Sequence, residues 1–170
     1  MKTLLIVRHA KSSWDFPELP DYERPLIETG IARTRKVIRY LQEMEIKPEL
    51  IICSHAVRAK ATALLIAEGL NYPVDKISIE EKIYSGNEDD VFDLIFGVPN
   101  TIEQLLIVGH NPTFTNMANN FLENPLEWLP TSGVVCIEFK TDKWENIFKA
   151  KKTTKFVISP KMVREGKGMK

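Results

Sequence analysis

The sequence predicts an α/β protein: a three-layer sandwich with helices on both faces of a mainly parallel central sheet and an antiparallel edge. Three short apolar runs of four residues each predict strands that are buried on both faces. These runs are residues 4–7, 50–53 and 105–108. Segments with helical spacing separate the runs, and this alternation of strand and helix is typical of a parallel sheet.

The helices are expected between the strands. A first helix over about 31–45 has its apolar residues at core-facing spacing, and a second runs from the turn after Ser54, whose hydroxyl can cap it, to about Gly69. A third helix is expected over about 87–98, and Pro112 is placed to start a fourth.

The remaining strands are expected at the edges of the sheet. A short strand is predicted at 74–79, and a closing antiparallel pair at 134–139 and 144–149. We expect one domain over residues 1–170, in which about 150–170 form a C-terminal extension.

Composition argues against several classes of protein. The chain has 170 residues, 44% hydrophobic content, 27% charged content and a formal net charge of zero, so nothing points to nucleic acid or membrane partners. The apolar run before Arg8 is too short for a signal peptide, and we expect a cytoplasmic protein. Cys53 and Cys136 lie inside apolar runs and are expected to be buried free thiols rather than a disulfide.

Each of the three apolar runs leads into a cationic or reactive side chain. Arg8 and His9 follow the first run, Arg58 lies just after the second, and His110 follows the third. If these strands are neighbours, their carboxyl ends converge on one pocket. Two guanidinium groups can neutralise a phosphoryl group without a metal ion, a neutral imidazole can attack phosphorus, and a second, protonated histidine can hold a phosphoryl oxygen.

The motifs at these positions resemble those of the histidine phosphatase superfamily. They are Leu-Ile-Val-Arg-His at 5–9, Ser-x-x-x-Arg-Ala-x-x-Thr at 54–62 and Val-Gly-His-Asn-Pro at 108–112. Within the family, the segment 8–14 and Arg24-Pro25-Leu26 look like the SixA-type phosphohistidine phosphatase branch. The resemblance runs from Met1 to about Phe139 and implies a phosphoglycerate-mutase-like fold.

The resemblance also implies a function. It implies a phosphatase that needs no metal or cofactor and works through a phosphohistidine intermediate, most simply on phosphohistidine of a protein in signalling, such as a histidine-containing phosphotransfer protein. The catalytic residues that it implies are His9 as nucleophile with Arg8, Arg58 and His110 around the phosphoryl group. The substrate-binding residues that it implies are Arg24 and Asn111.

Two positions depart from the family pattern. Many members have glycine where this chain has Ala10, and many have proline where this chain has His55. We expect His55 either to contact substrate or to lie on the surface. The carboxylic acid that larger relatives use to protonate the leaving group has no clear counterpart. Glu80 and Glu81 are candidates, but both also fit a solvated turn, and the SixA-type branch resembles this chain in lacking a clear acid.

Other activities remain open on the same residues. A phosphatase of small phosphate esters, a phosphoglycerate mutase and a non-catalytic module that binds phosphorylated ligands would each use a similar pocket. A cysteine-based phosphatase is excluded, because only four residues separate Cys53 from Arg58 where five are required, and the segment has no glycine.

Overall fold

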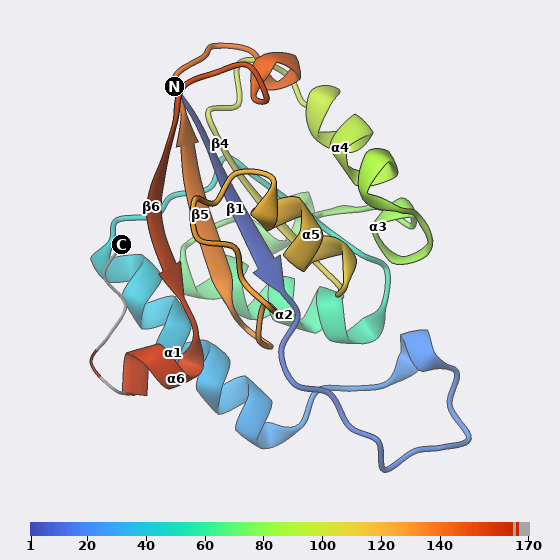
Figure 1. The fold of residues 1–170 in the computed structure, drawn as a ribbon. Coiled ribbons are helices and arrows are strands. Elements are labelled where there is room, and N and C mark those ends of the chain that lie inside the picture. The colour runs from blue at the N-terminus through green and yellow to red at the C-terminus, as the bar shows by residue number, and fades with distance from the viewer. Residues whose placement is uncertain (165, 167–170) are drawn as a thin grey trace.

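The sheet of the computed structural model, which describes residues 1–164 and 166, has six strands and a mainly parallel arrangement (Figure 1). The strands are β1 (Lys2–Arg8), β2 (Leu50–Cys53), β3 (Ser78–Ile79), β4 (Gln104–Gly109), β5 (Val134–Phe139) and β6 (Lys152–Ile158). Their order is β3-β2-β4-β1-β5-β6; the first four are parallel, β5 is antiparallel to β1, and β6 is antiparallel to β5. The predicted fold class is confirmed.

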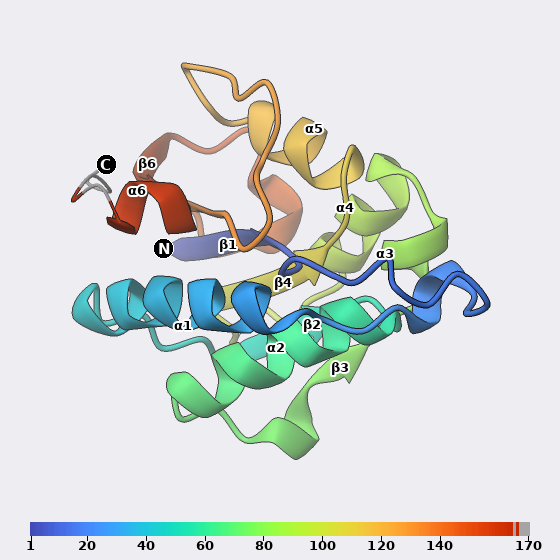
Figure 2. The same ribbon diagram turned by 90° about the horizontal axis from the view of Figure 1, so that it is seen from below.

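Helices form the two outer layers. They are α1 (Glu28–Glu43), α2 (Val57–Gly69), α3 (Lys82–Ser85), α4 (Glu88–Phe96), α5 (Thr113–Asn119) and α6 (Pro160–Arg164). Figure 2 shows α1 and α2 on one face of the sheet and α4 and α5 on the other. Single-turn 3-10 helices occur at Asp21–Glu23, Val74–Lys76 and Trp144–Asn146.

The four apolar residues of β1 serve both layers because side chains alternate along a strand. Leu4 and Ile6 pack into the core beneath α4 and α5, whereas Leu5 and Val7 pack into the core against α1 and α2. All four are at most 1% exposed. This two-sided burial is what the unbroken apolar run predicted.

The closing strand lies later in the chain than predicted. Residues 144–149 are not a strand: Trp144 is fully buried, and its indole Nε1 donates to the carbonyl oxygen of Ile102 at 2.8 Å. The strand that pairs with β5 is instead β6 at 152–158. Part of the expected extension 150–170 therefore belongs to the sheet, and residues 165 and 167–170 lie outside the described part of the chain.

Two smaller expectations also change. The predicted strand at 74–79 is mostly a 3-10 turn, and only Ser78 and Ile79 pair with β2. Ser54 does not cap α2, since the N-cap position is Ala56. Ser54 Oγ accepts the backbone N–H of Ala56 at 3.1 Å and also lies 2.8 Å from the ring nitrogen Nε2 of His110.

Because β6 belongs to the sheet, removing its buried aromatic ring should destabilise the whole domain. Phe156 is 1% exposed, so Phe156→Ala is expected to lower the free energy of unfolding by about 3–5 kcal/mol in a urea titration. The exposed neighbour Lys155, changed to alanine, is the control and should stay within about 0.5 kcal/mol of wild type. Equal, small effects of both changes on the free energy of unfolding would mean that β6 contributes little to the stability of the domain.

Candidate active site

The carboxyl ends of β1, β2 and β4 meet at one edge of the sheet because these strands are adjacent and parallel. Arg8 pairs with Gly109 in register, and the backbone N–H of His9 donates to the Gly109 carbonyl at 3.1 Å. As a result the rings of His9 and His110 lie with their centroids 5.1 Å apart. In Figure 1 this edge is at the arrowhead of β1, from which the blue loop leaves the sheet.

A cavity of about 450 Å³ opens at this edge. It is lined by Arg8, His9, Lys11, Ser12, Trp14, Arg24, Arg33, Arg58, His110, Asn111, Trp128 and Thr131. All six residues that the sequence singled out as catalytic or substrate-binding are therefore brought together. Among these lining residues there are five cationic side chains and no carboxylate, so the cavity favours an anionic ligand.

His9 is held in the form that a nucleophile needs. Its ring nitrogen Nδ1 lies 2.7 Å from the carbonyl oxygen of Ala10, which can only accept, so Nδ1 carries the proton. The pKa of His9 is lowered from 6.5 to about 4, mainly by burial; the hydrogen bond to Ala10 acts to raise it, and the nearby charge of Arg58 acts to lower it. The ring is neutral at pH 7, and Nε2 keeps its lone pair.

Arg8 and Arg58 each use Nη atoms of the guanidinium group for hydrogen bonds to the protein, which leaves the Nε–H group for a ligand. Arg8 Nη1 donates to the carbonyl of Leu129 at 3.1 Å, and Arg58 Nη1 and Nη2 donate to the backbone oxygen and Oδ2 of Asp21 at 2.7 and 2.9 Å. The Nε–H group of each is buried and meets no acceptor among the described residues. Burial, together with the charge of Arg58, lowers the pKa of Arg8. Both donors suit the oxygens of a phosphoryl group.

His110 differs from the sequence-based expectation of a protonated histidine. Burial is the main cause that lowers its pKa to about 3, with a smaller contribution from the neighbouring His9, so the ring is neutral at pH 7. Ser54 Oγ, which already accepts from Ala56, can donate its own O–H to Nε2. The proton of the neutral ring then sits on Nδ1, which is buried and has no partner among the described residues. His110 is thus placed to be a neutral hydrogen-bond donor.

The turn before His110 requires glycine. A Cβ atom at position 109 would lie 2.3 Å from the ring carbon Cζ of Phe114, a residue that is fully buried at the start of α5. The close approach of this ring to the end of β4 fixes the path of the chain into His110.

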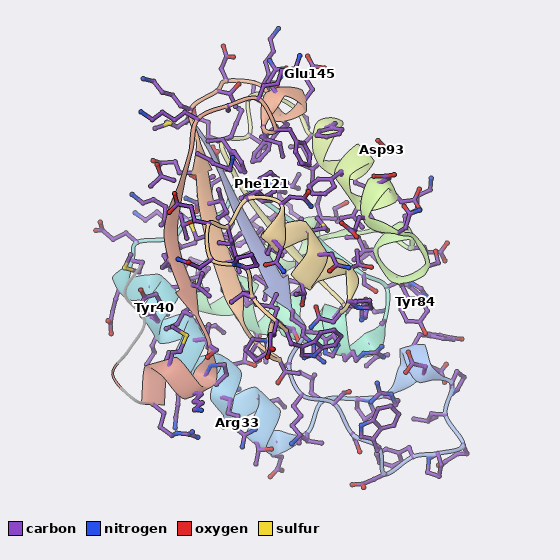
Figure 3. All side chains as sticks on the ribbon, in the orientation of Figure 1. Arg33, Tyr40, Tyr84, Asp93, Phe121 and Glu145 are labelled. Carbon is purple, nitrogen blue, oxygen red and sulfur yellow. The ribbon has the colours of Figure 1, made fainter. Side chains whose placement is uncertain are left out.

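Asp21, which sequence reasoning missed, organises the loop that follows β1. Its Oδ2 accepts from Arg58 Nη2 at 2.9 Å and from the Tyr84 hydroxyl at 2.7 Å, and its Oδ1 accepts from Arg24 Nε at 3.1 Å. Burial on its own would raise the pKa of Asp21, but the hydrogen bonds from Tyr84 and Arg58 lower it to about 2. Asp21 is therefore ionised, and it fixes Arg58 instead of holding a proton. Figure 3 shows Tyr84 on the side of α3 that faces this loop.

Arg24 and Asn111 line the cavity but also have structural partners. Arg24 Nη1 donates to Ser12 Oγ at 2.6 Å and to the carbonyl of Ser13 at 3.1 Å. Asn111 Nδ2 donates to the carbonyl of Leu129 at 2.7 Å. Its Oδ1 accepts from both the backbone N–H and the hydroxyl of Thr115 in α5. Their substrate-binding role stays a prediction.

The residues considered as further candidates lie outside the cavity lining. Glu80 and Glu81 immediately precede α3 and are not among the lining residues. His55 packs between the rings of Tyr22 and Tyr84, with centroids 5.6 and 5.2 Å away.

Both cysteines are buried free thiols, as predicted. Burial raises the pKa of Cys53 to about 11 and that of Cys136 to about 12, which disfavours a reactive thiolate. Within the described residues, no group of three or more His, Cys, Asp or Glu side chains is placed to hold a metal ion. The described helices also include none that is long and apolar enough to cross a membrane.

Comparison with known sequences points to one family. The model of the histidine phosphatase superfamily (branch 1) matches residues 4–81. An uncharacterized protein of Mycobacterium leprae is 28% identical over 153 residues, which cover 83% of this chain and 91% of that protein. An uncharacterized chloroplastic protein of Arabidopsis thaliana is 43% identical over 61 residues, which cover 36% of this chain but only 28% of that protein.

Solved structures share the fold over nearly the whole chain. The protein histidine phosphatase SixA, solved in complex with tungstate, has a TM-score of 0.78 at 19% identity, covering 93% of this chain and 97% of its own. A mycobacterial glucosyl-3-phosphoglycerate phosphatase has a TM-score of 0.62 at 12% identity, covering 91% and 97%. The phosphoglycerate-mutase-like fold that the sequence resemblance implied is therefore confirmed.

Fold and cavity together define a class of protein: an α/β domain whose cationic pocket, at the carboxyl edge of the sheet, holds a neutral histidine beside the partly buried Arg8 and the buried Arg58. The part of the chain that the model of the histidine phosphatase superfamily (branch 1) matches contains Arg8, His9 and Arg58 of this cavity.

The position of His9 gives a direct titration test. Because the pKa of His9 lies at about 4 rather than 6.5, its imidazole resonances in an NMR titration should change midway near pH 4. Protonation removes the Nε2 lone pair, so the capacity of His9 to act as a nucleophile should persist down to that pH. A midpoint near 6.5 would contradict the buried, neutral ring.

The contacts of Asp21 predict that it positions Arg58. Asp21→Asn keeps the size of the side chain but removes its charge, and we expect kcat/KM for an aryl phosphate to fall by about 10- to 100-fold as Arg58 shifts. Glu23→Gln, in the same 3-10 turn, is the control, because Glu23 forms no ion pair among the described residues. Wild-type activity in the Asp21 variant would show that Arg58 is held without it.

Proposed function

We propose that this protein is a metal-independent phosphatase that hydrolyses phosphohistidine of a phosphorylated protein through a covalent phosphohistidine intermediate at His9. The observation that carries the proposal is the state of His9. It is a buried, neutral imidazole whose Nδ1 proton is fixed by Ala10, and it shares a cavity with Arg8 and Arg58. Binding alone would need the arginines but not a histidine with a free lone pair.

In the first step, the lone pair of His9 Nε2 attacks phosphorus, the phosphorus–nitrogen bond of the substrate breaks, and the leaving imidazole takes a proton from solvent. The buried Nε–H groups of Arg8 and Arg58 would bind the phosphoryl oxygens and offset the charge that develops on them. The Nδ1–H group of His110 would donate to another oxygen. In the second step, water attacks the phosphohistidine, which releases inorganic phosphate and restores neutral His9.

The arrangement of charge favours a nitrogen leaving group. An alkoxide is strongly basic and needs a positioned proton donor, whereas an imidazole leaves much more easily. No carboxylate is among the described residues that line the cavity, and the nearby Asp21 has a pKa of about 2 and holds no proton at pH 7. Phosphohistidine is therefore a better substrate for this cavity than phosphoserine.

The comparisons support the same substrate class by analogy. The SixA structure with tungstate is named a protein histidine phosphatase and shares the fold at a TM-score of 0.78. A histidine-containing phosphotransfer protein is a natural partner for such an activity. A phosphatase of small phosphate esters is the second candidate, because a glucosyl-3-phosphoglycerate phosphatase shares the fold at a TM-score of 0.62.

Hydrolysis rates on matched peptides test the proposal. With a chelator present, kcat/KM should be at least about 100-fold higher for a phosphohistidine peptide than for the corresponding phosphoserine peptide or a small alkyl phosphate, since only the latter two need a general acid. Glu80→Gln and Glu81→Gln should each stay within a few fold of wild type on phosphohistidine. A large loss from either substitution, or a preference for the alkyl phosphate, would contradict the proposal and favour the second candidate.

A further inference from the structure

Two tryptophans line the cavity yet leave much of their surface open. Trp14 is 77% exposed and Trp128 is 53% exposed, and both belong to the cavity that holds His9. They come from distant parts of the chain: Trp14 from the loop after β1, and Trp128 from the loop that leads into β5 (Figure 1). The loops meet here because the end of β1 pairs with the start of β5. Large apolar side chains exposed at a binding cavity point to a contact with a ligand.

Each indole is fixed against a guanidinium group of the same cavity. The Arg24 Cζ atom lies 3.7 Å from the centroid of the Trp14 ring, and the Arg8 Cζ atom lies 5.8 Å from that of Trp128. These cation–π contacts hold one side of each ring. The exposed fractions show that much of the remaining ring surface stays accessible to a ligand.

The backbone beside Trp128 is anchored to the site as well. The next residue, Leu129, is fully buried, and its carbonyl accepts from both Arg8 Nη1 and Asn111 Nδ2. Its N–H group donates to the hydroxyl of Thr115 at 2.9 Å. Trp128 is therefore held in a defined place relative to Arg8 rather than lying on a free loop.

The other ten lining residues are all polar or charged, so the cavity has two chemically distinct parts. The polar part suits the oxygens of a phosphoryl group. The two indoles suit what is attached to that group, because they lie at the exposed rim of the cavity, where the substituent of a phosphoryl group bound by Arg8 and Arg58 would emerge. A flat unsaturated ring can stack on an indole, and a flexible aliphatic chain gains less from it.

We propose that Trp14 and Trp128 form a leaving-group subsite that selects substrates whose phosphoryl group is attached to a planar heteroaromatic ring, the imidazole of phosphohistidine. This inference rests on the proposed function, because it assigns the leaving-group side of the same cavity. The phosphoryl group is bound by the arginines, and the ring that it leaves is bound by the tryptophans.

Two substrates that both contain a phosphorus–nitrogen bond isolate the effect of the ring. Phosphoimidazole has the planar ring and phosphoramidate lacks it. The measured quantity is the ratio of kcat/KM on phosphoimidazole to kcat/KM on phosphoramidate. We expect this ratio to fall by about 3- to 10-fold in Trp14→Ala and by a similar factor in Trp128→Ala. The loss should appear mainly in KM, because the tryptophans bind the ring and do not take part in bond breaking.

Two further variants serve as controls. Phe16→Ala should leave the ratio unchanged, because Phe16 is an exposed aromatic residue of the same loop, at 46%, that does not line the cavity. Trp14→Phe keeps an aromatic ring and should restore most of the ratio that Trp14→Ala loses.

The outcomes separate this inference from the function on which it rests. If the tryptophan variants lower both rates by the same factor, or if the Phe16 variant shifts the ratio equally, the subsite is wrong while the phosphatase stands. If the wild-type protein hydrolyses neither substrate, the proposed function itself fails. A ratio that falls for both tryptophan variants and recovers in Trp14→Phe supports the subsite.

Discussion

The parallel pairing of β1 with β4 is the constraint on which the rest of the site depends. A histidine directly follows Arg8 at the end of β1 and Gly109 at the end of β4. Because Arg8 lies opposite Gly109, the two imidazoles emerge at the same edge, with their ring centroids 5.1 Å apart. A shift of one residue in this register would turn one set of apolar side chains away from its core, so the burial of both faces also protects the register. Gly109 completes the constraint, since Phe114 leaves no room for a side chain there.

Positive charges gathered at this edge repel one another, and two features of the structure reduce this repulsion. Both histidines stay neutral, because burial and the neighbouring cations lower their pKa values to about 4 and about 3. One carboxylate, Asp21, forms ion pairs with Arg58 and Arg24 and draws the loop after β1 onto α2. Buried N–H groups of Arg8, Arg58 and His110 then have no acceptor within residues 1–164 and 166, and they are the complement of a phosphoryl group.

Much of this could be predicted from the sequence, because the central strands are unbroken apolar runs and each leads directly into a charged or reactive residue. Adjacency of those strands then brings Arg8, His9, Arg58 and His110 together without further information. The edge strand 152–158 was missed because only one of its faces is buried and its exposed positions are lysine and threonine. Asp21 and Trp128 were missed because their roles depend on how irregular loops fold back on the site, and neither position carries a periodic signal.

We propose that His9 becomes phosphorylated during turnover. The most direct measurement is rapid quenching of the enzyme with a phosphoryl-labelled substrate, followed by mapping of the labelled residue by mass spectrometry under conditions that preserve phosphohistidine. We expect a label on His9, no label in His9→Ala, and normal labelling in His55→Ala, because His55 lies outside the cavity lining. A label on any other residue, or turnover that continues in His9→Ala, would contradict it.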